Sequence, residues 1–222
     1  MLIICDFDGT VTAEDTNSAL ARRFAPDAYA NVEGRLRSRE LTLRQVLDAE
    51  FAPITVGLDE VLDAALAIPF REGFDRLLDD AQRADWTFVL LSSGFAEIIR
   101  PMLAQAGVAD RVELVANSIS LGPEGGAITW RDLPVCEHCG EPCKRHDVAR
   151  LREQHAGSGT VAFIGDGMSD RCGAETADRI FARDGLATYL DGEGVEYERW
   201  DDFDDVRAAL GIDVGSLHGD RA

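Results

Sequence analysis

Residues 2–10 read Leu2-Ile3-Ile4-Cys5-Asp6-Phe7-Asp8-Gly9-Thr10, an apolar run that leads into two carboxylates and a glycine. If the apolar run forms a strand, Asp6 and Asp8 point to the same side, because side chains in a strand alternate with a period of two. Two anions at one point are unfavourable unless a cation or a shared proton compensates their charge. The pattern therefore predicts a metal site at the end of a strand.

Helical and extended patterns alternate from residue 71 onward. The pattern predicts helices over 74–81 and 98–103 and strands over 86–91, 112–115, 160–164 and 180–182. Strands separated by single helices favour a parallel sheet with helices on both faces, a Rossmann-like α/β core. The glycine-rich segment 122–126 predicts a β-hairpin turn, and residues 213–222 are expected to lack regular structure because they carry few apolar side chains.

The segment 13–70 has a helical spacing of apolar residues with breaks at Pro53 and Pro69. We expect it to form a helical cap domain, inserted after the first strand, that lies over whatever Asp6 and Asp8 bind. Residues 1–12 and 71–222 are then the α/β core, with the hairpin and a cysteine-rich loop at about 117–143.

The composition is strongly acidic, with 22 Lys and Arg against 41 Asp and Glu and a formal net charge of -19. Such a charge repels phosphate backbones and anionic membranes, and no cluster of basic residues offsets it. No apolar stretch approaches the ~18–20 residues of a membrane span. We therefore expect a cytoplasmic protein, monomeric or homodimeric, with neither nucleic acid nor a membrane as its partner.

Polar segments follow three of the predicted strands. Asp6 and Asp8 follow the first strand, Ser92-Ser93-Gly94 follows Leu90-Leu91, and Gly165-Asp166-Gly167-Met168-Ser169-Asp170 follows Phe163-Ile164. In an open parallel sheet, ligands bind beyond the carboxyl ends of the strands. Segments about eighty residues apart in sequence are thus expected to converge on one site.

The side chains of these segments suit a phosphoryl group and a hard cation. Asp166 adds a third carboxylate, and an all-oxygen donor set favours Mg²⁺. Ser92, with the backbone N–H groups of Ser93 and Gly94 at the start of the next helix, is expected to form an anion cradle. Lys144 opens a predicted helix and can place a positive charge near the same anion. Together these groups predict phosphoryl transfer.

The order of these segments resembles that of the four motifs of haloacid-dehalogenase-type phosphatases. The residues that carry the resemblance are Asp6-Phe7-Asp8-Gly9-Thr10, Ser92, Lys144 and Gly165-Asp166-Gly167-Met168-Ser169-Asp170. The match extends over nearly the whole chain, and the segment 13–70 resembles the cap of the phosphoserine-phosphatase-like branch.

The resemblance implies a role for each motif residue. Asp6 would be the nucleophile that forms an aspartyl-phosphate, and Asp8 the general acid and then base, with its backbone carbonyl on the metal. Asp6, Asp8 and Asp166 would hold Mg²⁺, and Asp170 would support either the metal or the lysine. The residues expected to bind the phosphate of a small-molecule ester are Ser92, Ser93, Gly94 and Lys144.

Two sub-families differ in the phosphate ester that they hydrolyse. Phosphoserine phosphatases typically carry a glutamate and an arginine in the cap, where this chain has Asp15 and Glu50, although Arg44 could substitute for the arginine. A carboxylate in place of an arginine would repel the carboxylate of phosphoserine. The methionine-salvage phosphatases of 2-hydroxy-3-keto-5-methylthiopentenyl-1-phosphate offer the better resemblance. The segments shared with them are Ile4–Thr10 with Asp15, Phe24-Ala25-Pro26, Arg71-Glu72-Gly73-Phe74, the cysteines before Lys144, and Phe181-Ala182-Arg183-Asp184.

Three of the five cysteines lie within eight residues, in Cys136-Glu137-His138-Cys139-Gly140-Glu141-Pro142-Cys143. Together with either His138 or His146 they could bind a structural Zn²⁺. Reduced thiols in a loop and a redox-active pair remain the alternatives. Bound zinc would fix the segment that delivers Lys144. The remaining cysteines, Cys5 and Cys172, are interpreted as small buried residues without a neighbouring ligand.

A hypothesis of another class is a catalytically silent, zinc-stabilised binding module. An inactive relative is expected to have lost at least one motif residue. The chain keeps the full set, which favours an enzyme: Asp6, Asp8, Lys144, Asp166 and Asp170.

Overall fold

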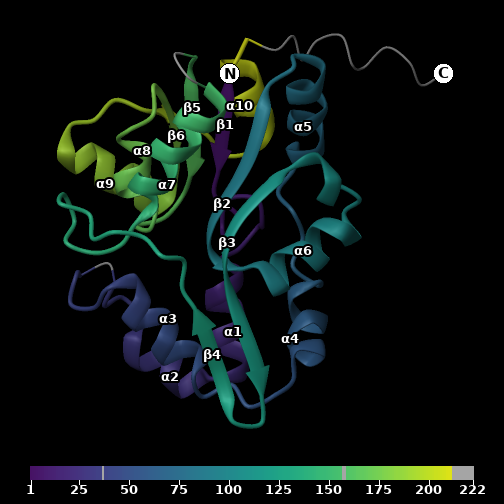
Figure 1. The fold of residues 1–222 in the computed structure, drawn as a ribbon, viewed down its shortest axis with the longest axis vertical. Coiled ribbons are helices and arrows are strands. Elements are labelled where there is room, and N and C mark those ends of the chain that lie inside the picture. The colour runs from purple at the N-terminus through teal and green to yellow at the C-terminus, as the bar shows by residue number, and fades with distance from the viewer. Residues whose placement is uncertain (37, 157–158, 212–222) are drawn as a thin grey trace.

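A computed structural model describes residues 1–36, 38–156 and 159–211 of the protein, so the predicted lack of structure over 213–222 lies outside the described residues (Figure 1). At its centre is a seven-stranded sheet with the order β4-β3-β2-β1-β5-β6-β7. The strands are β1 (Leu2–Cys5), β2 (Thr87–Phe95), β3 (Glu113–Gly122), β4 (Gly125–Thr129), β5 (Val161–Gly165), β6 (Arg179–Ala182) and β7 (Glu198–Arg199). Neighbouring strands are parallel except β3 and β4, which confirms the predicted α/β sheet.

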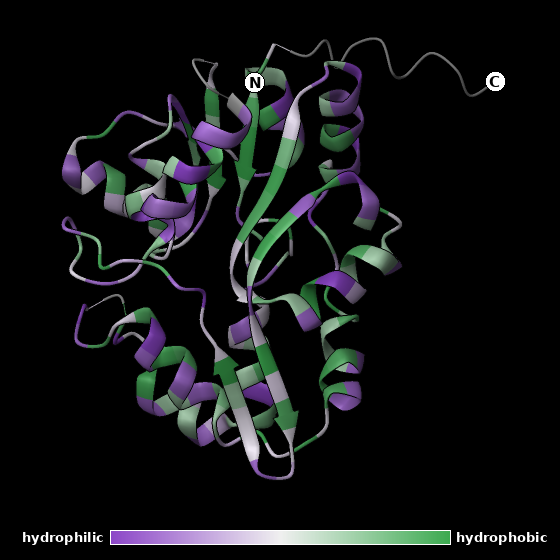
Figure 2. Cartoon of the chain, viewed as in Figure 1, coloured by the Kyte–Doolittle hydropathy of each residue, from purple (hydrophilic) through white to green (hydrophobic). Residues whose placement is uncertain are grey.

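Both faces of the central strands are buried. In β1, Ile3 and Cys5 belong to one apolar cluster, whereas Leu2 and Ile4 belong to a second cluster on the opposite face. This is why β1 is a continuous apolar run rather than an alternating one. In Figure 2 the central strands are accordingly coloured as hydrophobic over most of their length.

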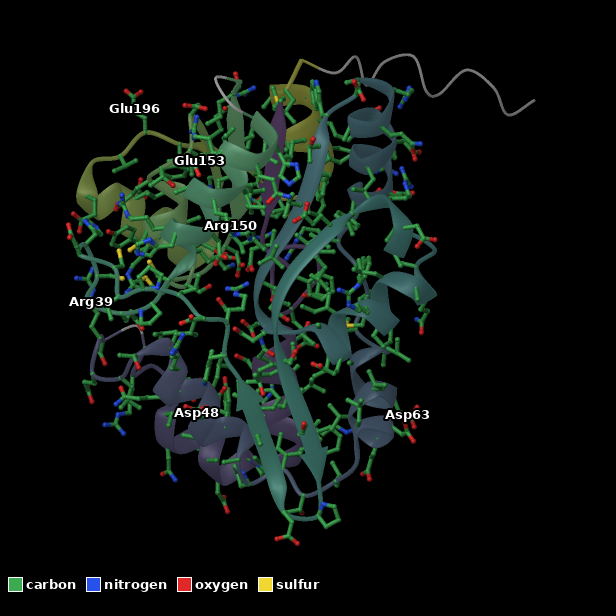
Figure 3. All side chains as sticks on the ribbon, viewed as in Figure 1. Arg39, Asp48, Asp63, Arg150, Glu153 and Glu196 are labelled. Carbon is green, nitrogen blue, oxygen red and sulfur yellow. The ribbon has the colours of Figure 1, made fainter. Side chains whose placement is uncertain are left out.

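Helices cover the two faces of the sheet as predicted (Figure 1). Helices α5 (Phe74–Arg83), α6 (Ala96–Gln105) and α10 (Phe203–Ala209) contribute to the larger apolar cluster. Helices α7 (Lys144–Leu151), α8 (Arg171–Ala174) and α9 (Asp184–Glu193) contribute to the other. Charged side chains such as Arg150, Glu153 and Glu196 lie on the outside (Figure 3).

The segment 13–70 forms four helices, α1 (Thr16–Phe24), α2 (Pro26–Val32), α3 (Leu43–Phe51) and α4 (Leu58–Ala65). Helix α3 begins with a capping box, in which Thr42 accepts from the Gln45 backbone and the Gln45 side chain accepts from the Thr42 backbone. Figure 1 shows α1–α3 beyond the carboxyl ends of the central strands.

The glycine-rich segment is a hairpin turn, as predicted, because β3 ends at Gly122 and β4 begins at Gly125. The hairpin lies against the end of α3, where the Gly126 N–H donates to the carbonyl of Ala52 over 3.2 Å. A Cβ atom on Gly126 would come within 2.3 Å of the Phe51 carbonyl oxygen, so only glycine permits this close approach.

Two features differ from the sequence expectation. Strand β2 runs on to Phe95, so α6 begins at Ala96 and not at Ser93. The short strand β7 and the helices α9 and α10 have no counterpart among the predicted elements.

In the part of the chain that the structure describes, no helix combines the length and the apolar character needed to cross a membrane.

Candidate active site

Asp6 and Asp8 lie directly after β1 and are 4% and 7% exposed. The chain turns sharply behind them, with the backbone N–H groups of Thr10, Val11 and Thr12 donating to the carbonyl of Phe7. Gly9 has a φ of +84°, and a Cβ atom there would lie 2.5 Å from a carboxylate oxygen of Asp166. The motif glycine thus permits both the turn and the approach of a third carboxylate.

Arg71 holds the loop after the two aspartates through side-chain hydrogen bonds to its backbone. Its guanidinium donates to the carbonyl of Gly9 over 2.9 Å and to that of Thr10 over 3.2 Å. The same guanidinium lies 5.6 Å from the centre of the Trp200 ring. Carbonyls that a turn leaves without a backbone partner are satisfied in this way.

The ammonium group of Lys144 lies between two carboxylates. Its Nζ is 2.5 Å from Asp6 Oδ1 and 2.7 Å from Asp170 Oδ1, and the lysine is 1% exposed. Lys144 is the first residue of α7, a position from which its side chain reaches the end of β1. The buried cation is held in the charged form, since attraction to Asp170 and Asp6 outweighs burial and raises the pKa of Lys144.

Asp166 and Asp170 complete an acidic cluster with Asp6, in which one oxygen of each lies within 4.8 Å of the others. Asp170 Oδ2 accepts from the backbone N–H groups of Asp166 and Gly167, both at 3.1 Å. Burial, and then the charge of Asp170, raises the pKa of Asp166 to about 8. When all three carboxyl groups are ionised, one lysine leaves two of their negative charges uncompensated, which matches a divalent cation with oxygen ligands.

Ser92 contacts Asp8 in this structure. Its hydroxyl donates to Asp8 Oδ2 over 2.8 Å and accepts from the backbone N–H of Gly94 over 2.7 Å. A Cβ atom on Gly94 would lie 2.6 Å from Asp8 Oδ2. Burial, and then the charge of Asp15, raises the pKa of Asp8 to about 6 although the bond from Ser92 lowers it. A carboxyl group with this pKa can exchange protons near neutrality.

The expected anion cradle at a helix start is wrong in its local geometry. Ser92, Ser93 and Gly94 lie inside β2, and the N–H of Gly94 is already bonded to Ser92 Oγ. Ser93 is half-buried and faces a pocket that also reaches Asp6 and Asp8. Two serines and a glycine follow the apolar part of the strand and prolong it to Phe95, which periodicity alone does not predict.

Two site residues escaped the sequence analysis, Asn117 on β3 and Arg131 beyond β4. The Asn117 amide donates to the Ser93 carbonyl over 2.8 Å and accepts from the Arg131 N–H over 3.0 Å. Arg131 donates to the Ser92 carbonyl over 3.1 Å and lies 3.2 Å from a carboxylate oxygen of Asp147. A buried asparagine directly after a predicted strand was the available signal.

The pocket that reaches Asp6 and Asp8 is lined largely by side chains of the helical segment 13–70. Apolar side chains line part of it, namely Leu36, Leu43, Val46 and Leu47, and the carboxyl groups of Asp15 and Glu50 line another part. Burial, and then the charge of Asp15, raises the pKa of Glu50 to about 7. None of the described residues that line this pocket is a lysine or an arginine.

The structure brings Cys136, Cys139 and Cys143 together, and the fourth side chain in their group is Cys172. The interpretation of Cys172 as a residue without a neighbouring ligand is therefore wrong. His146 lies in the first turn of α7 and is not part of the sulfur group, and His138 lies 3.3 Å from a carboxylate oxygen of Glu175. The expected histidine ligand is replaced by a cysteine thirty-three residues after Cys139 in sequence.

Comparison with known proteins agrees with this geometry. The family model described as haloacid dehalogenase-like hydrolase matches residues 3–175. A 2-hydroxy-3-keto-5-methylthiopentenyl-1-phosphate phosphatase of Microcystis aeruginosa is 30% identical over 210 residues, which cover 94% of this chain and 97% of that protein. A phosphatase of the same name from Bacillus thuringiensis subsp. konkukian is 27% identical and covers 94% of each chain. The resemblance read from the motifs is confirmed.

Solved structures share the fold. A phospho-aspartyl intermediate analogue of phosphoserine phosphatase superposes with a TM-score of 0.72 at 16% identity, covering 95% of this chain and 97% of that one. A phosphoserine phosphatase from T. onnurineus gives a TM-score of 0.70 at 18% identity, covering 94% and 93%. At these identities the likeness concerns the fold.

Proposed function

The chain belongs to the haloacid dehalogenase-like hydrolase family, and from this premise we propose that it is a magnesium-dependent phosphatase acting on a small-molecule phosphate monoester. The observation that carries the proposal is the Asp6–Lys144–Asp170 arrangement, in which a buried carboxylate that lines a pocket lies beside a fixed cation. The five cysteines of the chain form no disulfide, which supports a cytoplasmic enzyme.

Asp6 and Asp8 have unlike roles in the proposed reaction. A carboxylate oxygen of Asp6 attacks phosphorus, the bond from phosphorus to the ester oxygen breaks, and Asp8 gives its proton to the departing oxygen. Water then attacks the phosphorus of the aspartyl-phosphate, Asp8 takes a proton from the water, the bond from phosphorus to the Asp6 oxygen breaks, and phosphate leaves with Asp6 restored as a carboxylate. The raised pKa of Asp8, about 6, suits a group that must both give and accept a proton. Ser92 and Ser93, with Lys144, are proposed to orient the phosphoryl group.

The donor set at the site fits Mg²⁺. Carboxylates of Asp6 and Asp166 and the backbone carbonyl of Asp8 would hold the ion. Asp170 is already bonded to Lys144 and to two backbone N–H groups, so it is proposed to position its neighbours. When bound, the ion supplies positive charge against the oxygens of the transferring phosphoryl group.

The pocket favours an uncharged, partly apolar leaving group. Residues 13–70 are proposed to form a cap domain that selects this group, with Leu43, Val46 and Leu47 suited to an aliphatic or thioether chain. These features and the named relatives support 2-hydroxy-3-keto-5-methylthiopentenyl-1-phosphate as the substrate. Its chain carries no carboxylate for Glu50 to repel.

Phosphoserine is the second candidate, and the shared fold with phosphoserine phosphatases is what favours it. The cap arginine that could hold its carboxylate, Arg44, donates to the carbonyl of Arg131 over 3.1 Å and stacks 5.1 Å from the centre of the Trp130 ring. Because the pocket presents Asp15 and Glu50 instead, its charge opposes the serine carboxylate.

Steady-state kinetics on both esters tests the proposal. With saturating Mg²⁺ we expect kcat/KM for the methylthiopentenyl ester to exceed that for phosphoserine by at least about 100-fold. Chelation of Mg²⁺ should abolish both activities, and re-addition should restore them. A preference for phosphoserine would contradict the substrate assignment, and full activity in the chelated protein would contradict the metal requirement.

Glu50→Gln is expected to stabilise the protein more at pH 8 than at pH 5.5. The pKa of Glu50 rises on folding from its ordinary value of about 4.5 to about 7, so its stability contribution is complete below pH 4.5 and is lost as the pH rises through 7. Glutamine removes this loss. We expect the gain in unfolding free energy to be about 2 kcal/mol larger at pH 8 than at pH 5.5, because about 1.5 pH units separate pH 5.5 from the folded pKa.

Urea unfolding at the two pH values measures this difference. The matched control is Glu60→Gln, which changes an exposed glutamate on α4. It should change the unfolding free energy by the same small amount at both pH values. A gain for Glu50→Gln that does not depend on pH would refute the shifted titration.

A further inference from the structure

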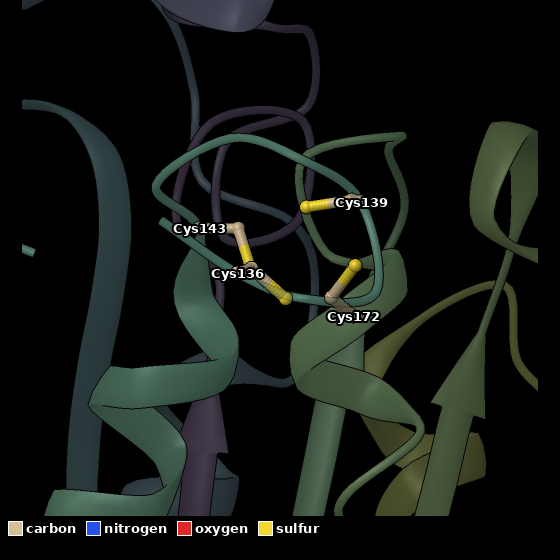
Figure 4. A group of neighbouring side chains, drawn as sticks. All are labelled: Cys136, Cys139, Cys143 and Cys172. Atoms are coloured by element: carbon tan, nitrogen blue, oxygen red, sulfur yellow. The ribbon is translucent and has the colours of Figure 1, made fainter. Parts of the chain in front are cut away.

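Four cysteine sulfurs form one compact group outside the site described above (Figure 4). Cys136 and Cys139 lie in the loop between β4 and α7, Cys143 directly precedes α7, and Cys172 is the second residue of α8. All four sulfur atoms lie within 4.8 Å of one another, and none is in a disulfide.

The loop that carries the first two sulfurs is a tight turn. The N–H of Gly140 donates to the Cys136 carbonyl over 2.8 Å, and Gly140 has a φ of +75°. An isolated bridge between Val135 and Pro142 closes the base of the turn. The turn thereby presents Cys136 and Cys139 toward Cys143 and Cys172.

The number and spacing of the sulfurs distinguish a metal site from a group of free thiols and from a disulfide. A tetrahedral zinc site with Zn–S distances of about 2.3 Å places its sulfurs about 3.8 Å apart. A disulfide would join two sulfurs at about 2.05 Å and would not gather the other pair. Cys136 and Cys172 are each 1% exposed, so the group is shielded from solvent on one side. Four mutually close sulfurs are the ligand set that soft thiolate coordination requires.

The surroundings suit an anionic centre. Four thiolates around Zn²⁺ carry two net negative charges. Arg171, next to Cys172, is 11% exposed and lies 2.8 Å from Glu141. This ion pair fixes a positive charge next in the chain to one of the four cysteines.

We propose that Cys136, Cys139, Cys143 and Cys172 bind a structural Zn²⁺ that clamps the start of α7 to the start of α8. The thiols release their protons to solvent on binding, and nothing is oxidised or reduced.

The clamp would act on Lys144, which contacts Asp6, and on Asp170, which contacts Lys144. Cys143 precedes Lys144, and Cys172 follows Asp170 by two positions, so the metal would tie together the segments that form the 2.7 Å contact from Lys144 to Asp170. The helices already pack closely here, since a Cβ atom on Gly173 would lie 3.1 Å from Lys144 Cβ. A fixed distance between these segments fixes the position of the ammonium group.

Elemental analysis of protein purified without chelators and supplied with Zn²⁺ tests the ligand set. We expect about one zinc per chain in the wild type, in His146→Ala and in Cys5→Ala, and less than about a fifth of that in Cys139→Ser and Cys172→Ser. A wild type free of zinc would overturn the proposal. The proposal would also be overturned if His146→Ala lost zinc and Cys172→Ser retained it, because the fourth ligand would then be His146.

Co²⁺ substitution of the wild type covers the case in which a cysteine variant fails to fold. We expect the charge-transfer and d–d bands of a tetrahedral tetrathiolate, and a spectrum of three thiolates with an imidazole would refute Cys172 as a ligand.

Hydrogen exchange tests the clamp. Zinc is removed with a chelator, and Mg²⁺ is then added back. We expect backbone amide exchange to become at least about tenfold faster in the first turn of α7 and in α8, and to stay unchanged in α5. Equal rates with and without zinc would overturn the clamp.

Discussion

Asp6→Asn is expected to lower kcat by at least about 10⁴-fold, whichever ester is the substrate. An amide oxygen is a poor nucleophile toward phosphorus, and among the described residues the other carboxylates of the cluster already have hydrogen-bond partners, Asp166 with Thr10. Asp8 is bonded to Ser92, and Asp170 to Lys144 and two N–H groups. Monoester hydrolysis can demand an acceleration near 10²¹, whereas general acid–base catalysis supplies only about 10²–10⁴. Little rate remains once the covalent route is closed.

The measurement is kcat with saturating Mg²⁺ on p-nitrophenyl phosphate and on the preferred ester. Asp80→Asn is the matched control, because Asp80 is also buried, at 4% exposure, and ion-paired, with Arg207 at 2.5 Å, but belongs to the α5–α10 contact. The control should lose stability and keep kcat. If Asp6→Asn kept more than about 1% of the wild-type kcat, the nucleophile assignment would fail.

The convergence of distant motifs could be predicted because it follows from sheet topology. Apolar runs ending in polar residues indicate strand ends, and parallel strands bring their carboxyl ends to one edge. The register confirms this, since Cys5 at the end of β1 pairs with Leu90 of β2 and with Ile164 of β5. Asp6, Ser92 and Asp166 follow at the same edge.

The fourth cysteine could not be predicted in the same way. Cys172 is separated from the other three by α7 and β5, and its approach depends on how α8 packs on α7 through Gly173. Spacing within the loop indicated a knuckle completed by the nearby His138 or His146. A sequence pattern shows which residues are close along the chain, but not which residues helix packing brings together. The prolonged β2 was missed for a related reason. Its polar residues are stabilised by Asn117 and Arg131, which are distant in sequence.

Lys144→Met is expected to lower both stability and activity, the former by about 3–5 kcal/mol at pH 8. Methionine has a similar length but leaves the carboxylates of Asp6 and Asp170 buried without their cation. Burial, and then the charge of Asp170, already raises the pKa of Asp6 well above its usual range, and Lys144 opposes that rise. Without the lysine the pKa of Asp6 rises further.

A carboxyl group whose pKa is raised on folding contributes stability that is present at low pH and lost as the pH rises through the folded pKa. The destabilisation of Lys144→Met should therefore be smaller at pH 5.5 than at pH 8 in urea unfolding. We expect kcat to fall by about 10²–10³-fold, because a positive charge that faces the phosphoryl group is lost.

Arg207→Met separates the two effects. Arg207 is a second buried cation, 2% exposed, that lies 2.5 Å from Asp80 and 2.6 Å from Asp204. Its loss should also leave carboxylates unpaired and destabilise the fold, yet spare kcat at temperatures where the variant is folded. Equal losses of kcat in both variants would mean that Lys144 acts only through stability. A loss confined to Lys144→Met assigns the cation to the chemistry at Asp6, because both variants remove one buried positive charge and only one of those charges touches the nucleophile.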